Sequence, residues 1–218
     1  MEPILRTTES IDWITIIILF SLLFIVMAKT LFYNRFMNFI VLPFNNKYIF
    51  MYNKKEKLLN WFNIFFGVFQ LINLSLFVFY IWHLFWPTEN DHYPFMFLLL
   101  LGSILIFTIL KMFLQWSNGF IFGSNRIISD IIFRKISYFN YSAIIMFVAN
   151  IILTYILKDS KPVVYLTIFM IILINAIGWI SVLKNHQNLI KSNFFYFILY
   201  LCALEIAPLV IIASYLKQ

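Results

Sequence analysis

Six apolar stretches, each about as long as a membrane span, run through this chain of 218 residues. They cover residues 11–32, 60–86, 94–116, 136–157, 162–183 and 194–215. A helix needs roughly 20 apolar residues to cross the hydrocarbon core of a bilayer. Charged residues make up 11% of the chain, against roughly 25% in a soluble domain, which excludes a soluble globular fold. We therefore expect one all-α domain over residues 1–218, a polytopic bundle of about six transmembrane helices in the lipid bilayer.

The basic residues indicate how this bundle lies in the membrane. Twelve of the sixteen Lys and Arg residues fall on one side of the predicted spans, whereas Arg6, Lys158, Lys161 and Lys217 fall on the other. Positively charged residues favour the cytoplasmic side of a membrane. We therefore expect both ends of the chain outside the cytoplasm. This distribution also accounts for the net charge of +7, so we expect no nucleic-acid partner.

Two loops on the predicted cytoplasmic side, residues 33–59 and 117–135, combine apolar residues at helical spacing with basic residues. This pattern is typical of short helices that lie in the membrane interface. Such helices are either simple connectors or a docking surface for a partner protein or anionic lipid. The candidate docking residues are Arg35, Asn45, Asn46, Lys47, Tyr48, Arg126, Arg134 and Lys135.

Glu205 is the acidic residue that lies deepest in a predicted span. It lies eleven residues into the last stretch, which places it roughly 16 Å from the inner end of a helix that rises 1.5 Å per residue. Pro208 leaves the Leu204 carbonyl without its usual helical donor. An ionised carboxylate at this depth is costly and is a default functional candidate. Glu205 is therefore either a proton or cation site, or a neutral carboxyl that hydrogen-bonds across a helix interface.

Five other polar residues inside the spans are possible partners of Glu205. They are Gln70, Asn73, Lys111, Asn150 and Asn175. Lys111 lies close enough to the inner end of its span for its ammonium group to reach the interface. Asn175, Gly178 and Ser181 recur every three residues, which places them on one helix face. Each polar residue either bonds to a neighbouring helix or lines a path for a substrate.

The sequence lacks the motifs of catalysis and of metal binding. It contains one cysteine, Cys202, and its three histidines do not have the spacing of metal ligands. It contains no phosphate-binding glycine loop, no nucleophile elbow and no zinc-protease motif. We expect a protein without enzyme activity, cofactor or metal.

The run FFYFILYLCALEIAP at residues 194–208 resembles the C-terminal signature of a multi-span family from Bacteroidota that is catalogued as a domain of unknown function. Asp12-Trp13, Arg35-Phe36 and the run FNNKY at residues 44–48 are similar to that family as well. The resemblance covers nearly the whole chain. It implies an inner-membrane protein of a Gram-negative bacterium, with both chain ends in the periplasm. Glu205 and Pro208 match the signature, but the resemblance implies no activity or substrate.

Two functions from different classes fit these observations. The first is a non-enzymatic accessory or scaffold subunit that binds other inner-membrane proteins in an envelope complex, for example one for protein secretion or translocation. The second is a small proton- or cation-coupled transporter that uses Glu205. The transporter requires a hydrated cavity that reaches Glu205, whereas the subunit requires stoichiometric protein partners.

Overall fold

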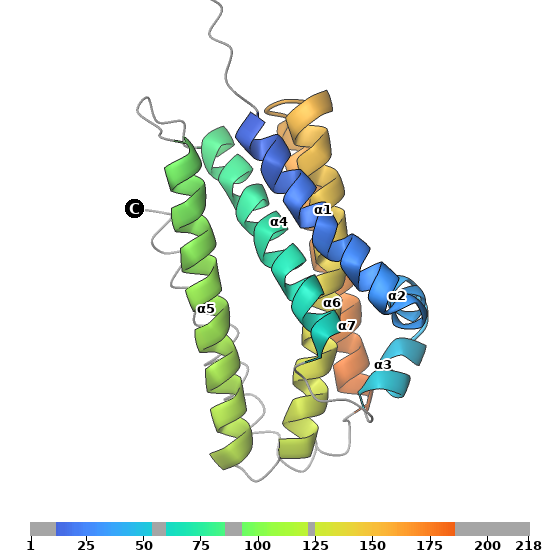
Figure 1. Cartoon of the computed structure of the whole chain (residues 1–218). Helices are drawn as coiled ribbons and strands as arrows, with labels where there is room; N and C mark the ends of the chain where they lie inside the picture. Colours follow the sequence, from blue (N-terminus) through green and yellow to red (C-terminus); the bar gives the residue numbers. More distant parts are fainter. Residues whose placement is uncertain (1–11, 54–59, 86–92, 122–124, 186–218) are drawn as a thin grey trace, which may run out of the picture.

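A computed structural model describes residues 12–53, 60–85, 93–121 and 125–185, and this part of the chain is entirely helical (Figure 1). The helices are α1 (Asp12–Leu31), α2 (Tyr33–Ile40), α3 (Lys47–Tyr52), α4 (Trp61–Phe85), α5 (Tyr93–Ile121), α6 (Asn125–Ile151), the π-helical turn η1 (Ile152–Ile156) and α7 (Lys161–Asn185). Five segments are long and apolar enough to span a membrane: α1, α4, α5, α6 with η1, and α7. The all-α fold class is confirmed. The predicted sixth span, residues 194–215, lies outside the described residues.

The described spans agree with the predicted ones except at the start of α6. This helix begins at Asn125, and its membrane-spanning part runs from Ser129 to Ile156, whereas the sequence predicted a span over residues 136–157. The predicted separate interfacial helix within residues 117–135 is therefore wrong. Arg134 pairs with Asp130 within α6, so charged residues that interrupt the hydropathy pattern do not interrupt the helix.

Helices α4 and α6 form the centre of the bundle. Helix α4 packs against α1, α5 and α6, and α6 also packs against α5 and α7. Half of the α4 span residues are buried within the protein, against 6% of the α5 span residues. Figure 1 shows α5 on the opposite side of α6 from α3. The outer helices therefore present most of their apolar surface outwards.

Helices α2 and α3 fold onto the end of the bundle at which α1 finishes (Figure 1). The first loop thus contains two short helices, as predicted. One set of apolar side chains in this segment is buried, since Phe39, Leu42, Tyr48 and Ile49 are each at most 1% exposed, whereas Phe50 and Met51 are exposed. Phe39 packs against Phe66 of α4 with ring centroids 4.5 Å apart. One apolar side of this loop therefore joins the core of the bundle.

Helices α6 and α7 approach each other closely at Gly178. A Cβ atom at this position would lie 2.8 Å from two ring atoms of Tyr138, which is closer than real Cβ contacts. The chain turns between η1 and α7 through Asp159, whose φ of 54° is left-handed. Aspartate is one of the few non-glycine residues that adopt this conformation readily. This short turn makes α6 and α7 an antiparallel pair.

Candidate functional site

The guanidinium group of Arg35 is buried where α2, α3 and α4 meet. Its Nε and Nη2 atoms both donate to the hydroxyl oxygen of Tyr48 at 3.4 Å, and Nη2 also donates to Oδ1 of Asn63 at 3.2 Å. The guanidinium carbon lies 4.9 Å from the ring centre of Tyr52 and 4.8 Å from that of Phe62. Aromatic faces attract a cation, each by about 0.5–2 kcal/mol. Arg35 therefore fastens both short helices to the bundle.

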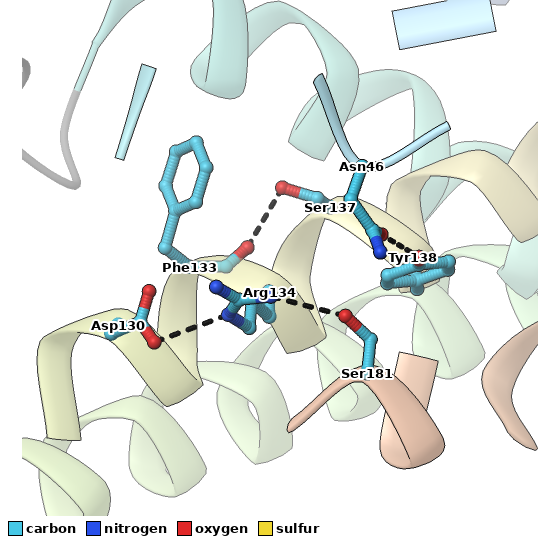
Figure 2. Close-up of polar contacts among 7 residues, drawn as sticks. All are labelled: Asn46, Asp130, Phe133, Arg134, Ser137, Tyr138 and Ser181. Carbon is cyan, nitrogen blue, oxygen red and sulfur yellow. Dashed lines mark hydrogen bonds and ion pairs between the residues drawn. The ribbon is translucent and has the colours of Figure 1, made fainter. Parts of the chain in front are cut away.

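A second buried arginine, Arg134, joins α6 to α7 (Figure 2). Its Nε atom lies 3.1 Å from Oδ2 of Asp130, one turn earlier, and its Nη1 atom donates to Oγ of Ser181 at 3.0 Å. Its guanidinium carbon lies 5.9 Å from the ring centre of Phe50 on α3. Arg134 is 3% exposed, so these contacts replace water around its charge.

Tyr138 extends the same contact region, one turn further along α6. Its hydroxyl group donates to Oδ1 of Asn46 at 3.1 Å, and Ser137 donates to the backbone oxygen of Phe133 at 2.7 Å (Figure 2). The ring of Phe133 stacks on that of Tyr48 with an interplanar angle of 12°. The α2–α3 segment is thus bonded to α4 through Arg35 and to α6 through Tyr138.

A second polar group lies between α4 and α6, nearer the middle of the spans. The Nδ2 atom of Asn150 donates to the backbone oxygen of Asn73 at 3.0 Å. Thr154 donates to the backbone oxygen of Asn150 at 2.6 Å and shares a hydrogen bond with the hydroxyl group of Tyr80. Among the residues that the structure describes, the buried Oδ1 atoms of Asn140 and Asn150 accept no hydrogen bond.

The π-helical turn η1 follows directly on Asn150 and contains Thr154. The backbone N–H of Leu157 donates to the oxygen of Ile152, five residues earlier, at 2.8 Å. Such turns insert one residue into a helix and are frequent at functional sites. Here the turn places Thr154 in contact with Tyr80 on α4.

The remaining predicted polar residues have different surroundings. Asn175 donates to Oγ of Ser142 on α6 at 3.0 Å, which is an interhelical hydrogen bond of the kind expected. Gln70 is buried in α4, and Lys111 is half-buried on α5. Glu205 and Pro208 lie outside the described residues, so their roles stay predictions.

Three of the candidate docking residues are buried. Arg35, Tyr48 and Arg134 are each at most 4% exposed. Their charges and rings are directed at other parts of the same chain. We therefore assign these three to the interior of the protein and not to a docking surface.

The other candidate docking residues lie nearer the surface. Asn45, Asn46 and Lys47 are exposed, between α2 and the start of α3. Lys135 is half-buried, with its Nζ atom 4.3 Å from the ring centre of Trp179. Arg126 lies in the first turn of α6, and its side chain is outside the described part. Among the docking candidates whose side chains are described, the exposed ones thus lie in one short connection.

Several residues of these contacts were not singled out from the sequence. They are Tyr80, Asp130, Tyr138 and Ser142. Asp130 and Arg134 have the four-residue spacing of a helical ion pair, which is a usable signal. Tyr80, Tyr138 and Ser142 have no such signal, because their partners lie on other helices.

The described side chains do not assemble a metal site. Across residues 12–53, 60–85, 93–121 and 125–185, no group of three His, Cys, Asp or Glu residues is placed to hold a metal ion. The polar groups described above bond mainly to one another across helix interfaces. Within the described part of the chain, these bonds join α6 to α4 and to α7.

Comparison with known proteins identifies the family. No curated protein and no solved structure matches this chain. Residues 14–216 match the model of a family described as a domain of unknown function, DUF4271. This match covers most of the chain and includes all five candidate membrane spans except the first two residues of α1. The chain therefore belongs to the DUF4271 family, as a multi-span membrane protein.

Proposed function

We propose that this protein is a non-enzymatic accessory or scaffold subunit of a larger complex in the bacterial inner membrane, such as a protein secretion or translocation system. The observation that carries the proposal is that buried polar side chains form hydrogen bonds to other residues of the same chain. Arg134, Asn150 and Asn175 each bond to another residue of the chain. These bonds support a role for the polar groups in joining helices, as in other membrane bundles.

The outer helices supply the surface that such a subunit needs. Phe95, Leu98 and Leu99 on α5 are each at least 59% exposed, and α5 is the least buried of the five spans. Apolar contacts between helices in lipid depend on close packing, so this surface suits either lipid or the helix of a partner.

Site-specific photo-crosslinking tests the proposal in intact cells. A photoreactive residue replaces Leu98, which is 63% exposed, or Phe69, which is fully buried and serves as the control. We expect Leu98 to form a crosslink with one membrane protein that also co-purifies stoichiometrically in mild detergent, and Phe69 to form none. A monodisperse protein that lacks a stoichiometric partner and crosslinks to lipid alone would contradict the proposal.

The proposed orientation places both chain ends in the periplasm. Its support is the charge asymmetry of the loops together with the position of α2 and α3, which carry Arg35 and Lys47 at the end where α1 finishes (Figure 1). In this orientation the turn at Asp159 is periplasmic and Lys184 is cytoplasmic.

Proton- or cation-coupled transport through Glu205 is the second candidate. It is favoured by one observation, the buried Oδ1 atoms of Asn140 and Asn150 that accept no hydrogen bond from the described residues. Buried oxygens of this kind bind water or a cation where space allows. Transport predicts a proton or cation flux in proteoliposomes that Glu205→Gln abolishes without loss of the folded protein. Sealed proteoliposomes that contain the folded protein and show no proton or cation flux would exclude transport.

A further inference from the structure

Lys161, the first residue of α7, holds its ammonium group against an aromatic ring. Its Nζ atom lies 5.7 Å from the ring centre of Phe85, the last residue of α4. The ring of Tyr165, one turn further along α7, packs edge-on against the same Phe85 ring, with the two ring centres 6.1 Å apart. These three side chains form a cluster of one cation and two rings at the end of the bundle opposite α2 and α3 (Figure 1).

This cluster carries positive charge that the described residues do not neutralise. Lys161 and Lys158, in the turn before α7, are both exposed, and neither forms an ion pair within the described part of the chain. Asp159, in the same turn, lies close enough to the hydroxyl group of Tyr80 on α4 to act on it electrostatically. The two ammonium groups are therefore available to an anion from outside the chain.

The side of α7 that continues from Lys161 into the span is exposed and aromatic. Lys161, Tyr165 and Phe169 follow one another at four-residue spacing, so they lie along one side of the helix. Tyr165 and Phe169 are each 58% exposed. They lie roughly 6 Å and 12 Å along the helix axis from Lys161. With increasing depth, this side presents an ammonium group, a phenol and an apolar ring.

The parts of a phospholipid follow the same order: a phosphate group, then glycerol esters, then acyl chains. Basic residues near a membrane surface attract anionic lipid headgroups. Tyrosine rings are enriched at the level where the headgroups meet the hydrocarbon core. A soluble anion such as free phosphate would contact Lys161 but would leave the rings of Tyr165 and Phe169 uncovered. The arrangement therefore matches a lipid and not a soluble anion.

We propose that Lys161, Phe85, Tyr165 and Phe169 form a binding site for an anionic phospholipid. Lys161 binds the phosphate group, and Lys158 of the adjoining turn adds to the positive charge. Tyr165 contacts the glycerol region, and Phe169 contacts an acyl chain. The inference does not rest on the proposed subunit function, which concerns the surface of α5.

Helix α1 provides a matched control position within the same chain. It starts at the same end of the bundle as α7, but its first residue is Asp12 and not a lysine (Figure 1). Phe20 lies eight residues after Asp12, as Phe169 lies eight residues after Lys161. Phe20 is 52% exposed. The two phenylalanines thus have similar depth and exposure, with opposite charges at the start of their helices.

Photo-crosslinking to lipid tests the site in the full-length protein. A photoreactive phenylalanine analogue replaces Phe169 or Phe20, and the protein is reconstituted in vesicles of equal parts phosphatidylglycerol, which is anionic, and phosphatidylethanolamine, which is zwitterionic. Mass spectrometry of the adducts gives the ratio of the two lipids at each position. We expect an excess of phosphatidylglycerol of about fivefold at Phe169, the effect of one basic residue near the membrane surface. We expect equal amounts of the two lipids at Phe20.

Charge variants test whether Lys161 causes this excess. Lys161→Gln should reduce the excess at Phe169 by at least half, and Lys161→Gln combined with Lys158→Gln should abolish it. Lys184→Gln, which removes an exposed lysine from the other end of α7, should leave it unchanged. An equal excess at Phe20, an excess that persists in the double variant, or a Phe169 crosslink to protein in place of lipid would overturn the proposed site.

Discussion

Gly178 shows how one residue sets the distance between two helices. The ring of Tyr138 occupies the place where any larger residue would put its Cβ atom. Ser181, one turn later on the same face, accepts the hydrogen bond of Arg134. Small residues at a helix interface in lipid allow this close approach, which van der Waals packing requires.

We predict that Gly178→Ala destabilises the protein by about 1–3 kcal/mol, the usual cost of overpacking a close contact. Gly67→Ala and Gly102→Ala are the controls, because a Cβ atom at either position meets nothing within 4 Å. Their unfolding temperatures in detergent should equal or slightly exceed that of the unmodified protein. Equal unfolding temperatures for all three variants would show that α6 and α7 do not touch at Gly178.

The hydrogen bond between Tyr80 and Thr154 should contribute a measurable coupling energy between these two side chains. Tyr80→Phe and Thr154→Val each remove one hydroxyl group. The double-mutant cycle should give a coupling of at least about 0.6 kcal/mol, the average for hydrogen bonds between membrane helices, and at most about 1.7 kcal/mol. Thr108→Val is the control partner, because Thr108 bonds only to its own helix at the Leu105 oxygen. Reversible unfolding in mixed detergent measures the cycle, and a coupling equal to that of the control would contradict the bond.

Single residues could be predicted where their partners follow a helical spacing. Asn175, Gly178 and Ser181 were placed on one face, and that face packs on α6. Arg35 and Arg134 were candidate docking residues, yet both are buried. A sequence pattern gives the face of a helix, but it does not give the aromatic rings and hydroxyl groups that other helices bring to a charge.

At the scale of elements, the α2–α3 segment closes one end of the bundle. Tyr48 is 1% exposed and contacts Arg35, Phe39 and Phe133, whereas Phe44, in the connection between the two helices, is 89% exposed. The α2–α3 segment is thus held by the side chains that face the bundle, such as Tyr48, and not by exposed apolar side chains such as Phe44.

Tyr48→Ala should therefore release α3 and cost about 3–5 kcal/mol, as for other large aromatic core truncations. Phe44→Ala should leave stability within about 0.5 kcal/mol, as is usual for surface substitutions. Limited proteolysis of membranes opened on the cytoplasmic side should cut Tyr48→Ala faster between α1 and α4. Equal cleavage of the two variants would mean that α3 is not anchored through Tyr48.

Hydropathy predicted the five described spans with ends close to those of the helices, except at the end of α5, which continues to Ile121, and at the start of α6. Residues 60–86 were predicted and α4 covers Trp61–Phe85, but α6 begins at Asn125 and not near residue 136. Hydropathy counts charged residues as interruptions. The pair of Asp130 and Arg134 instead satisfies its own charges inside a continuous helix, and Ser181 supplies a further partner.

At the scale of the whole molecule, the protein is a membrane bundle, and we propose that its basic end lies in the cytoplasm. Five spans are described, and residues 194–215 supply the predicted sixth. Six spans return the chain to the side on which it starts. The proposed orientation, with both chain ends in the periplasm, requires this last crossing.

Reporter fusions test the six-span topology most directly. Alkaline phosphatase is active only outside the cytoplasm, and green fluorescent protein folds there poorly. Fusions after Asp159 and after Gln218 should show phosphatase activity without fluorescence, and a fusion after Lys184 should show the reverse. Fluorescence without phosphatase activity after Gln218 would mean an odd number of crossings, and would contradict the sixth membrane helix.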